Sequence, residues 1–303
     1  MTLSKPATSP RQLKPLHRVR ILSLALNLPG PAAMMRLKSM GATCTKAEPP
    51  AKDGNTSGDP MSAYNPAAYD TMHAGIKVAR MDLKTEEGQG ALHKELARTD
   101  VLITSFRPSA LEKLGLGWNV LRKRYPALSM VSIVGAPGER AEEPGHDLTY
   151  LAEAGLVPGL DLPTTLFADM SGALMSSEAV LQAVLQHKIT GKSSFQEVAL
   201  SDAAHWLALP RSWGLTQAKG MVGGAHAGYR VYPCKNGRGA VAALEPHFAA
   251  ALCEAAGVRV GAVSSLLKPA THAAIAAFLA GKTRQQLEKL AAEKDIPLHT
   301  LAF

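Results

Sequence analysis

The stretch "VRILSLALNLPGPAAMMRLKSMGATCTKAE", residues 19–48, decides the fold class. Its first eight residues form a short apolar run that turn-forming residues end, which is the pattern of a strand buried in a parallel sheet. Residues 30–41 then predict a helix, with Pro31 at a favourable first position and Gly41 as a stop signal. Residues 42–48 predict the next strand. A strand, a glycine-containing turn, a helix and a strand form a βαβ unit, which is the start of a doubly wound sheet.

Strands and helices continue to alternate along the chain. Further strands are predicted at residues 76–83, 101–106, 128–135 and 194–200, and helices are predicted to begin at Thr85, Ser109, Trp118, Ser171 and Ser201. The polar, turn-rich residues 49–70 predict a long loop, and long loops inside compact domains are often functional. The alternation favours an α/β class with a doubly wound, largely parallel sheet of the Rossmann-like type.

The character of the sequence changes near residue 215. The segment "GGAHAGYRVYPCKNGRGAVAAL", residues 223–244, predicts two strands joined by a turn at Asn236-Gly237, which is a strong hairpin signal. Helices are predicted to follow from Glu245, Thr271 and Thr283. We therefore divide the chain into a flexible N-terminal tail, a large α/β domain and a small α+β domain, with the bounds 1–17, 18–215 and 216–303.

The composition restricts the kind of partner. The formal net charge of +8 favours anionic partners, among them a phosphate-bearing small molecule. The basic residues are scattered without a nucleic-acid-binding signature, so no nucleic-acid partner is expected. Three separated cysteines without a CxxC motif favour buried, reduced thiols in a cytoplasmic protein and no metal site. The apolar run at residues 21–26 is far shorter than the ~20 residues of a membrane span, so no membrane partner is expected.

The chain lacks the two glycine motifs with which many α/β proteins bind nucleotides. No GxGxxG follows the first predicted strand, and no GxxxxGK[ST] occurs anywhere. Both absences weaken the prediction of a dinucleotide-binding or nucleoside-triphosphate-binding protein.

Three groups with acid–base chemistry stand where a strand or loop leads into a helix, the place where α/β folds carry active residues. They are the segment Gly145-His146-Asp147, Asp169 and Glu245. A helix cap is an alternative explanation for each carboxylate, with His146 then incidental. The functional alternative for Asp169 is a partly desolvated carboxylate that faces a ligand, which the small residues 171–173 allow to approach.

Six segments occur in the order seen in the family III CoA-transferases, and only together are they specific. They are "GPAAMMRLKSMGA", "MDLKTEEGQ", "SFRPSALEKLGLG", "GHDLTYLAEAGL", "ADMSGAL" and "GYRVYPCKNGRGAVAALEPHF". The family includes carnitine and formate CoA-transferases and α-methylacyl-CoA racemases. The chain resembles the racemase branch most, because His146 stands where transferases usually carry an aromatic residue, and "GGAHAGYRVY" stands in place of their glycine run.

The resemblance implies an enzyme that moves a proton at the α carbon of a 2-methylacyl-CoA. His146 and Asp169 would act on opposite faces of that carbon, each with a pKa near neutrality, and Glu245 would orient His146. Backbone N–H groups near Asp147 or Asp169 would stabilise the enolate oxygen. In the transferase alternative, Asp169 attacks the thioester and then carries CoA as an aspartyl thioester. A third alternative is a divergent member that binds CoA thioesters with weak or no activity.

The resemblance also implies how coenzyme A is held in the large domain. Arg107 and Lys113 match family positions near the nucleotide, although each could be a plain surface charge. Gly145, Asp147 and Tyr150 belong to the segment expected to line the binding pocket, and core packing is an equal explanation for Tyr150. A CoA thioester is thus expected as substrate, with no tightly bound cofactor.

Family members form interlocked dimers with the site between the large domain of one subunit and the small domain of the other, so a homodimer is expected. The chain departs from the family pattern in several places. Glu48-Pro49-Pro50 replaces a basic residue near the adenine nucleotide, Lys77 and Arg80 are the only charges of another usually basic segment, the loop 156–167 is short, and the family's return segment after the small domain is missing. These departures affect the expected CoA affinity more than the fold.

Overall fold

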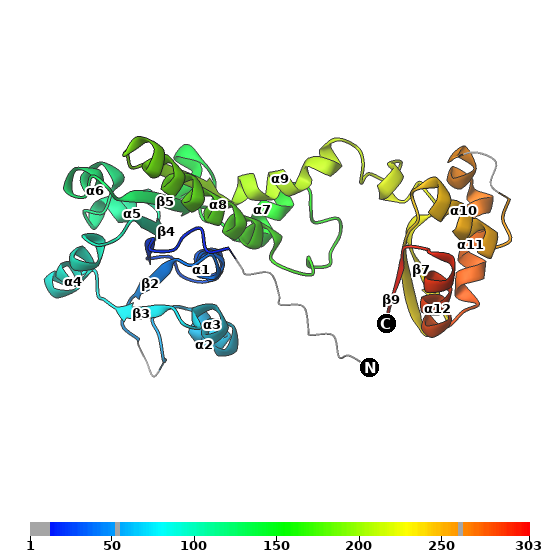
Figure 1. The fold of residues 1–303 in the computed structure, drawn as a ribbon, viewed down its shortest axis with the longest axis horizontal. Coiled ribbons are helices and arrows are strands. Elements are labelled where there is room, and N and C mark those ends of the chain that lie inside the picture. The colour runs from blue at the N-terminus through cyan, green and yellow to red at the C-terminus, as the bar shows by residue number, and fades with distance from the viewer. Residues whose placement is uncertain (1–12, 52–54, 260–262) are drawn as a thin grey trace, which may run out of the picture. The chain divides into compact units, whose positions relative to one another are not determined.

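The computed structural model describes residues 13–51, 55–259 and 263–303. The chain divides into two compact units between Ala208 and Leu209, within helix α9 (Leu200–Ser212). The boundary that we predict from the sequence, between residues 215 and 216, lies a few residues further on. Each unit has its own sheet (Figure 1). Residues 1–12 of the predicted tail lie outside the described residues, whereas Leu16 is buried.

The larger unit contains a parallel sheet whose described strands follow the order β3-β2-β1-β4-β5-β6. The strands are β1 (Arg20–Ser23), β2 (Thr43–Glu48), β3 (Lys77–Arg80), β4 (Val101–Thr104), β5 (Ser129–Val134) and β6 (Phe195–Ala199). The order of the strands reverses between β1 and β4, which pair directly with Ile21 opposite Val101. This confirms the predicted doubly wound sheet, and such sheets bind ligands in the crevice at the reversal point.

Helices cover both faces of this sheet (Figure 1). Those of the larger unit are α1 (Pro29–Ser39), α2 (Met61–Tyr64), α3 (Pro66–His73), α4 (Glu86–Leu96), α5 (Pro108–Lys113), α6 (Trp118–Arg124), η1 (Gly138–Glu142), α7 (Asp147–Glu153) and α8 (Phe167–Thr190). Successive strand residues point to opposite faces. Ile21 and Ile103 therefore pack in the core under α1 and α8, whereas Leu22 and Leu102 pack in the core under α4, α5 and α6.

The prediction of one long loop at residues 49–70 is wrong, because α2 and most of α3 lie there. Asn65 caps α3 by accepting a hydrogen bond from the Ala68 N–H at 3.1 Å, and Pro66 occupies the first helical position. Both helices are too short for apolar periodicity to reveal them.

Several helices begin earlier than predicted, and α5 and α8 bear on the site. The helix α5 begins at Pro108 instead of Ser109, because the fixed φ of proline suits the first helical position. The helix α8 begins at Phe167 instead of Ser171, which places Asp169 inside its first turn. The Asp169 N–H donates to the carboxylate of Asp147 in α7, and a local sequence pattern cannot reveal a contact between two helices.

The smaller unit packs helices against a three-stranded antiparallel sheet of order β7-β8-β9. Its elements are η2 (Met221–Gly223), β7 (Tyr229–Cys234), β8 (Gly237–Ala242), α10 (Pro246–Ala255), η3 (Val263–Leu267), α11 (Pro269–Ala280), α12 (Arg284–Lys294) and β9 (Leu298–Leu301). The hairpin β7–β8 is as predicted, whereas β9 is too short to stand out in the sequence. All three cysteines are buried and form no disulfide, as predicted.

Candidate active site

A cleft of about 200 Å³ opens at the carboxyl ends of β1, β4 and β5 in the larger unit. Its lining includes Leu26, Asn27 and Pro29 after β1, Ser105, Phe106 and Arg107 after β4, and Gly135, Gly145, His146, Tyr150 and Asp169 from the segments after β5. This is the reversal point of the sheet, where loops from its two halves face each other. Five residues that the sequence predicts to be functional therefore share one cleft: Arg107, Gly145, His146, Tyr150 and Asp169.

Asp169 is the most perturbed acid of the cleft. Burial and, after it, the negative charge of Asp147 raise the pKa of this carboxyl to about 6, and His146 opposes the shift. Its backbone N–H donates a hydrogen bond of 2.9 Å to Oδ1 of Asp147. The alternative that Asp169 is itself the N-cap of α8 is wrong, because Leu166 occupies that position.

Asp147 supports α8 instead of its own helix. It is the first residue of α7 and is buried, while its carboxylate accepts the N–H of Asp169 22 residues away. His146 is the N-cap residue of α7, and its backbone N–H donates to Oγ1 of Thr149 at 3.1 Å. The alternative in which Asp147 caps α7 is wrong, because His146 occupies the N-cap position. The His146 side chain is exposed and lines the cleft.

Tyr150 closes one side of the cleft between two glycines. A Cβ atom at Gly135 would lie 2.3 Å from the Tyr150 hydroxyl oxygen, and a Cβ atom at Gly145 would lie 2.4 Å from it. Burial raises the pKa of Tyr150, the negative charge of Asp169 adds to the shift, and Arg107 opposes it. Gly145 thus leaves space for the Tyr150 ring, which packs against it in the wall of the cleft.

These contacts predict a selective rescue. Gly135→Ala and Gly145→Ala should each cost about 1–3 kcal/mol of unfolding free energy, because the added methyl group overlaps the Tyr150 side chain. Adding Tyr150→Phe should restore the Gly135→Ala protein, where the nearest remaining ring atom is 3.2 Å away. It should not restore Gly145→Ala, where two ring carbons remain at 2.7 Å. Urea denaturation of the four variants measures this difference, and equal rescue at both glycines would contradict the packing.

The two predicted phosphate-binding residues differ in position. Arg107 is exposed at the N-cap of α5 and lines the cleft. Lys113 is exposed in the last turn of α5 and is not part of the cleft lining. Both lie close enough to Glu142 to lower the pKa of that carboxyl, although hydrogen bonds from Ser109 are the larger cause.

Glu245 belongs to the smaller unit. It is exposed at the N-cap of α10, where its side chain makes no capping hydrogen bond. A capping role therefore explains why Glu245 stands at the start of a helix, but its carboxylate does not make the capping hydrogen bond. Its predicted role in orienting His146 stays a prediction.

A second cavity, of about 260 Å³, lies beside the cleft and shares Phe106 with it. It is lined by Glu48, Pro49 and Pro50 at the end of β2, by residues 81–84 after β3, and by Leu24, Ala47, Phe106 and Leu114. Most of these groups are apolar, and the charged ones are Lys84, Glu48 and Asp82. A mostly apolar lining suits a flat, partly apolar group.

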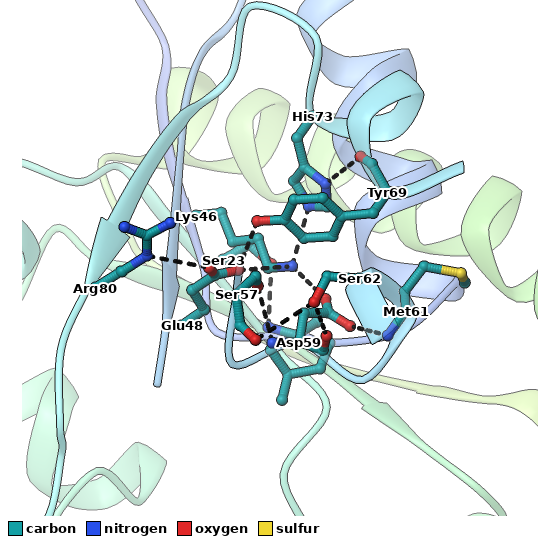
Figure 2. Close-up of polar contacts among 12 residues, drawn as sticks. Ser23, Lys46, Glu48, Ser57, Asp59, Met61, Ser62, Tyr69, His73 and Arg80 are labelled. Atoms are coloured by element: carbon teal, nitrogen blue, oxygen red, sulfur yellow. Dashed lines mark hydrogen bonds and ion pairs between the residues drawn. The ribbon is translucent and has the colours of Figure 1, made fainter. Parts of the chain in front are cut away.

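Sequence reasoning missed a buried ionic cluster, which we call the lysine cluster: Lys46, Glu48, Asp59, Tyr69 and His73 (Figure 2). Lys46 forms ion pairs with Asp59 and, at 3.4 Å, with Glu48. Asp59 in turn accepts the backbone N–H of Asn27, a cleft residue. The available signal was a lysine inside the buried strand "TCTKAE", because lysine is almost never fully buried unless it is paired.

The described parts of the chain contain no group of three or more His, Cys, Asp or Glu side chains suited to a metal ion. Among the same residues, no helix combines the length and apolar character needed to cross a bilayer.

Residues 16–302 match the model of CoA-transferase family III. The chain belongs to CoA-transferase family III. The solved structure of a hypothetical protein from Mycobacterium tuberculosis superposes with a TM-score of 0.79 at 25% identity, covering 94% of this chain and 85% of that one. A CAIB/BAIF family protein from Brucella suis has a TM-score of 0.76 at 24% identity, covering 96% and 85%. The α/β fold with a parallel and a smaller antiparallel sheet is thus the family III fold.

Curated relatives include both transferases and racemases. A probable fatty acyl-CoA transferase of Mycobacterium tuberculosis is 32% identical over 66% of this chain and 53% of its own length. The cinnamoyl-CoA:phenyllactate CoA-transferase of Clostridium sporogenes is 31% identical over 61% and 49%. The alpha-methylacyl-CoA racemase of Homo sapiens is 26% identical over 80% and 65%. The chain spans about half the length of the first two relatives.

Proposed function

We propose that this family III chain acts on acyl-CoA thioesters and transfers a proton at the α carbon of a 2-methylacyl-CoA. One observation carries the proposal: Asp169, with its pKa raised to about 6, lines the same cleft as His146 at the reversal point of the sheet. Near neutral pH both the protonated and the ionised forms of this carboxyl are accessible, which a group that alternately gives and takes a proton requires.

In the proposed reaction, one of the two groups removes the α proton, and the electron pair of the broken C–H bond moves into the thioester carbonyl. The other group then returns a proton to the opposite face of the carbon. The enolate oxygen needs hydrogen-bond donors. The Asp169 N–H already donates to Asp147, so the proposed donors are the first N–H groups of α7.

Coenzyme A would extend from the cleft past Phe106 into the second cavity. Arg107 at the rim of the cleft would contact phosphate, and the apolar walls of the second cavity would take the adenine ring, with Lys84 near its phosphates. Lys113, outside both linings, would contribute only long-range attraction. Asp147 and Gly145 would shape the pocket without contacting CoA themselves, because one is buried and the other accommodates Tyr150.

The smaller unit and a second subunit complete the proposal. By family resemblance, Glu245 would orient the His146 imidazole and fix its tautomer, in an interlocked homodimer that joins large and small domains of different subunits. The exposed Glu245 carboxylate, which is not engaged in capping α10, is free for such a contact.

CoA transfer between carboxylic acids is the second candidate, because the relatives with 30% identity or more are named as transferases. In this reaction, the Asp169 carboxylate attacks the thioester carbonyl, the C–S bond breaks, and a mixed anhydride forms as CoA thiolate leaves. The thiolate then attacks the aspartyl carbonyl, which releases the donor acid and leaves an aspartyl-CoA thioester. A divergent member that binds CoA thioesters without turnover is the third candidate.

Two incubations separate these candidates. With a 2-methylacyl-CoA in deuterium oxide, proton transfer incorporates deuterium at the α carbon, and a wild-type protein without such exchange would contradict the first candidate. With a donor acyl-CoA and hydroxylamine, transfer yields a hydroxamate on the peptide that contains Asp169. Calorimetric CoA binding without either product would support the third candidate, and absence of CoA binding would contradict all three.

A further inference from the structure

The lysine cluster is a buried ionic centre of the larger unit, in which Oε1 of Glu48 has no hydrogen-bond partner among the described residues (Figure 2). Lys46 is 1% exposed, and its ammonium group contacts Asp59, the Glu48 carboxylate at 3.4 Å and Nε2 of His73 at 3.0 Å. Asp59 and His73 form hydrogen bonds with this ammonium group, and Glu48 forms an ion pair with it. The Tyr69 hydroxyl donates to Glu48 at 2.9 Å.

The histidine of the cluster acts as a neutral acceptor. Nδ1 of His73 lies 2.6 Å from the Tyr69 carbonyl oxygen, so Nδ1 carries the proton and Nε2 accepts from Lys46. Burial lowers the pKa of His73, and the Lys46 charge lowers it further. The buried part of the cluster thus holds one cation and two carboxylates, and Arg80 at the rim lies 4.0 Å from Glu48.

Asp59 connects the cluster to the loop that follows β1. Its two carboxylate oxygens lie 3.1 and 3.2 Å from the backbone nitrogen of Asn27, which donates its N–H to them. Asn27 has a φ of +61°, a left-handed conformation that non-glycine residues adopt only when the surroundings favour it. The Asp59 carboxylate provides such surroundings.

The held residue forms part of the cleft wall. Asn27 lines the cleft together with Leu26 and Pro29, and its side-chain oxygen accepts a hydrogen bond of 3.4 Å from Tyr64. The pKa of Tyr64 is raised by burial and then by the charges of Asp59 and Asp169, so this hydroxyl lies within the field of both carboxylates. The loop therefore lies between the lysine cluster and the proposed catalytic acid.

Asp59 is itself firmly held. Its N–H donates to Ser57 Oγ at 2.9 Å, its carbonyl oxygen accepts from the Ser62 hydroxyl at 2.8 Å, and Oδ1 accepts the Met61 N–H at 2.9 Å. Well-packed apolar residues can replace a buried ion pair without loss of stability. Apolar residues cannot accept the Asn27 N–H, so an apolar replacement of the ion pair would leave this N–H without the acceptor that Asp59 provides.

We propose that Asp59 is a positioning residue: backed by Lys46, it holds the Asn27 loop in the conformation that forms one wall of the acyl-CoA cleft. The inference rests on the proposed function only for the identity of the ligand. The role of Asp59 in placing the loop is separately measurable.

The test compares Asp59→Ala with Tyr69→Phe, which weakens the same cluster without touching Asn27 or the cleft. In Asp59→Ala, hydrogen exchange of a peptide containing the Asn27 amide should rise about tenfold or more, because a hydrogen bond to a charged group is lost. The turnover number for α-deuterium exchange should fall about 100-fold with KM nearly unchanged, since misplaced groups mainly affect the chemical step. Tyr69→Phe should leave both quantities within about twofold while it lowers stability.

A third variant keeps the proposal testable if Asp59→Ala does not fold. Asp59→Asn retains one acceptor oxygen but loses the charge opposite Lys46, and its effects should lie between those of the other two variants. Unchanged exchange at Asn27 in an Asp59 variant, or equal loss of turnover in Tyr69→Phe, would overturn the proposal. A wild-type protein that neither binds CoA nor exchanges deuterium would refute the proposed function, whereas the hydrogen-exchange result would still decide the role of Asp59.

Discussion

Asp169→Asn is expected to lower α-deuterium exchange about 10³-fold for the enantiomer whose α proton faces Asp169, because the amide cannot accept or return a proton. The wild-type rate of the step in which Asp169 is the base should rise with pH through about 6, since only the ionised carboxylate accepts a proton. Deuterium incorporation followed by mass spectrometry between pH 5 and 8 measures both effects.

The same substitution is expected to stabilise the fold at neutral pH. The pKa of Asp169 is higher in the folded state than its ordinary value of 3.8, so the folded protein favours the protonated form. Burying the ionised Asp169 carboxylate therefore costs no stability below pH 3.8 and its full amount of stability above about pH 6. Relative to the difference at pH 4, Asp169→Asn should therefore gain about 1–2 kcal/mol of unfolding free energy at pH 7.5.

Asp161→Asn is the matched control, because Asp161 is exposed on the loop before α8 and lies outside the cleft lining. This variant should keep its activity and show no comparable pH-dependent gain in stability. Asp169→Asn with more than a tenth of the wild-type rate would contradict the assignment of Asp169. Loss of both activity and stability would indicate misfolding instead of a chemical role.

Lys46→Met is expected to cost about 3–5 kcal/mol of unfolding free energy, since it leaves two buried carboxylates without their cation. Lys77→Met on the neighbouring strand β3 is the matched control. Lys77 pairs with Glu95 at 3.1 Å, but its side chain is 59% exposed, so this change should cost less than about 1 kcal/mol.

Urea denaturation at neutral pH compares the two lysine variants. Adding Asp59→Asn to Lys46→Met should recover part of the loss, because one of the stranded charges is then removed. Equal costs for Lys46→Met and Lys77→Met would contradict the conclusion that the lysine cluster depends on a paired, desolvated cation.

Several parts of the fold could be predicted because their signals are local. The buried runs that became β1, β4 and β5 contain consecutive apolar residues and end at turns, which is how strands covered on both faces are recognised. Thr85 caps α4 by accepting the Gly88 N–H at 3.1 Å, as its position in the sequence predicts. Signals of this kind need no knowledge of distant residues.

The candidate site could be predicted only in part. Positions at helix starts point to His146 and Asp169, and the family resemblance points to Arg107 and Tyr150. The doubly wound order brings all four to one cleft. The support of Asp169 by Asp147 joins residues on two helices, and a local pattern cannot reveal such a contact. The same limit applies to β9, whose pairing with β8 joins segments about 60 residues apart.

The sequence alone determined the α/β class, the parallel strands and the set of polar groups that stand before helices, because apolar periodicity, turns and caps act over a few residues. Only the tertiary structure decided which of those groups face the cleft, that the carboxylate of Asp147 in α7 accepts an N–H of α8, and that Lys46 and Asp59 form a buried pair beside Asn27. These outcomes depend on the burial of charged groups and on ion pairs between separate elements. Both arise only when the chain has packed.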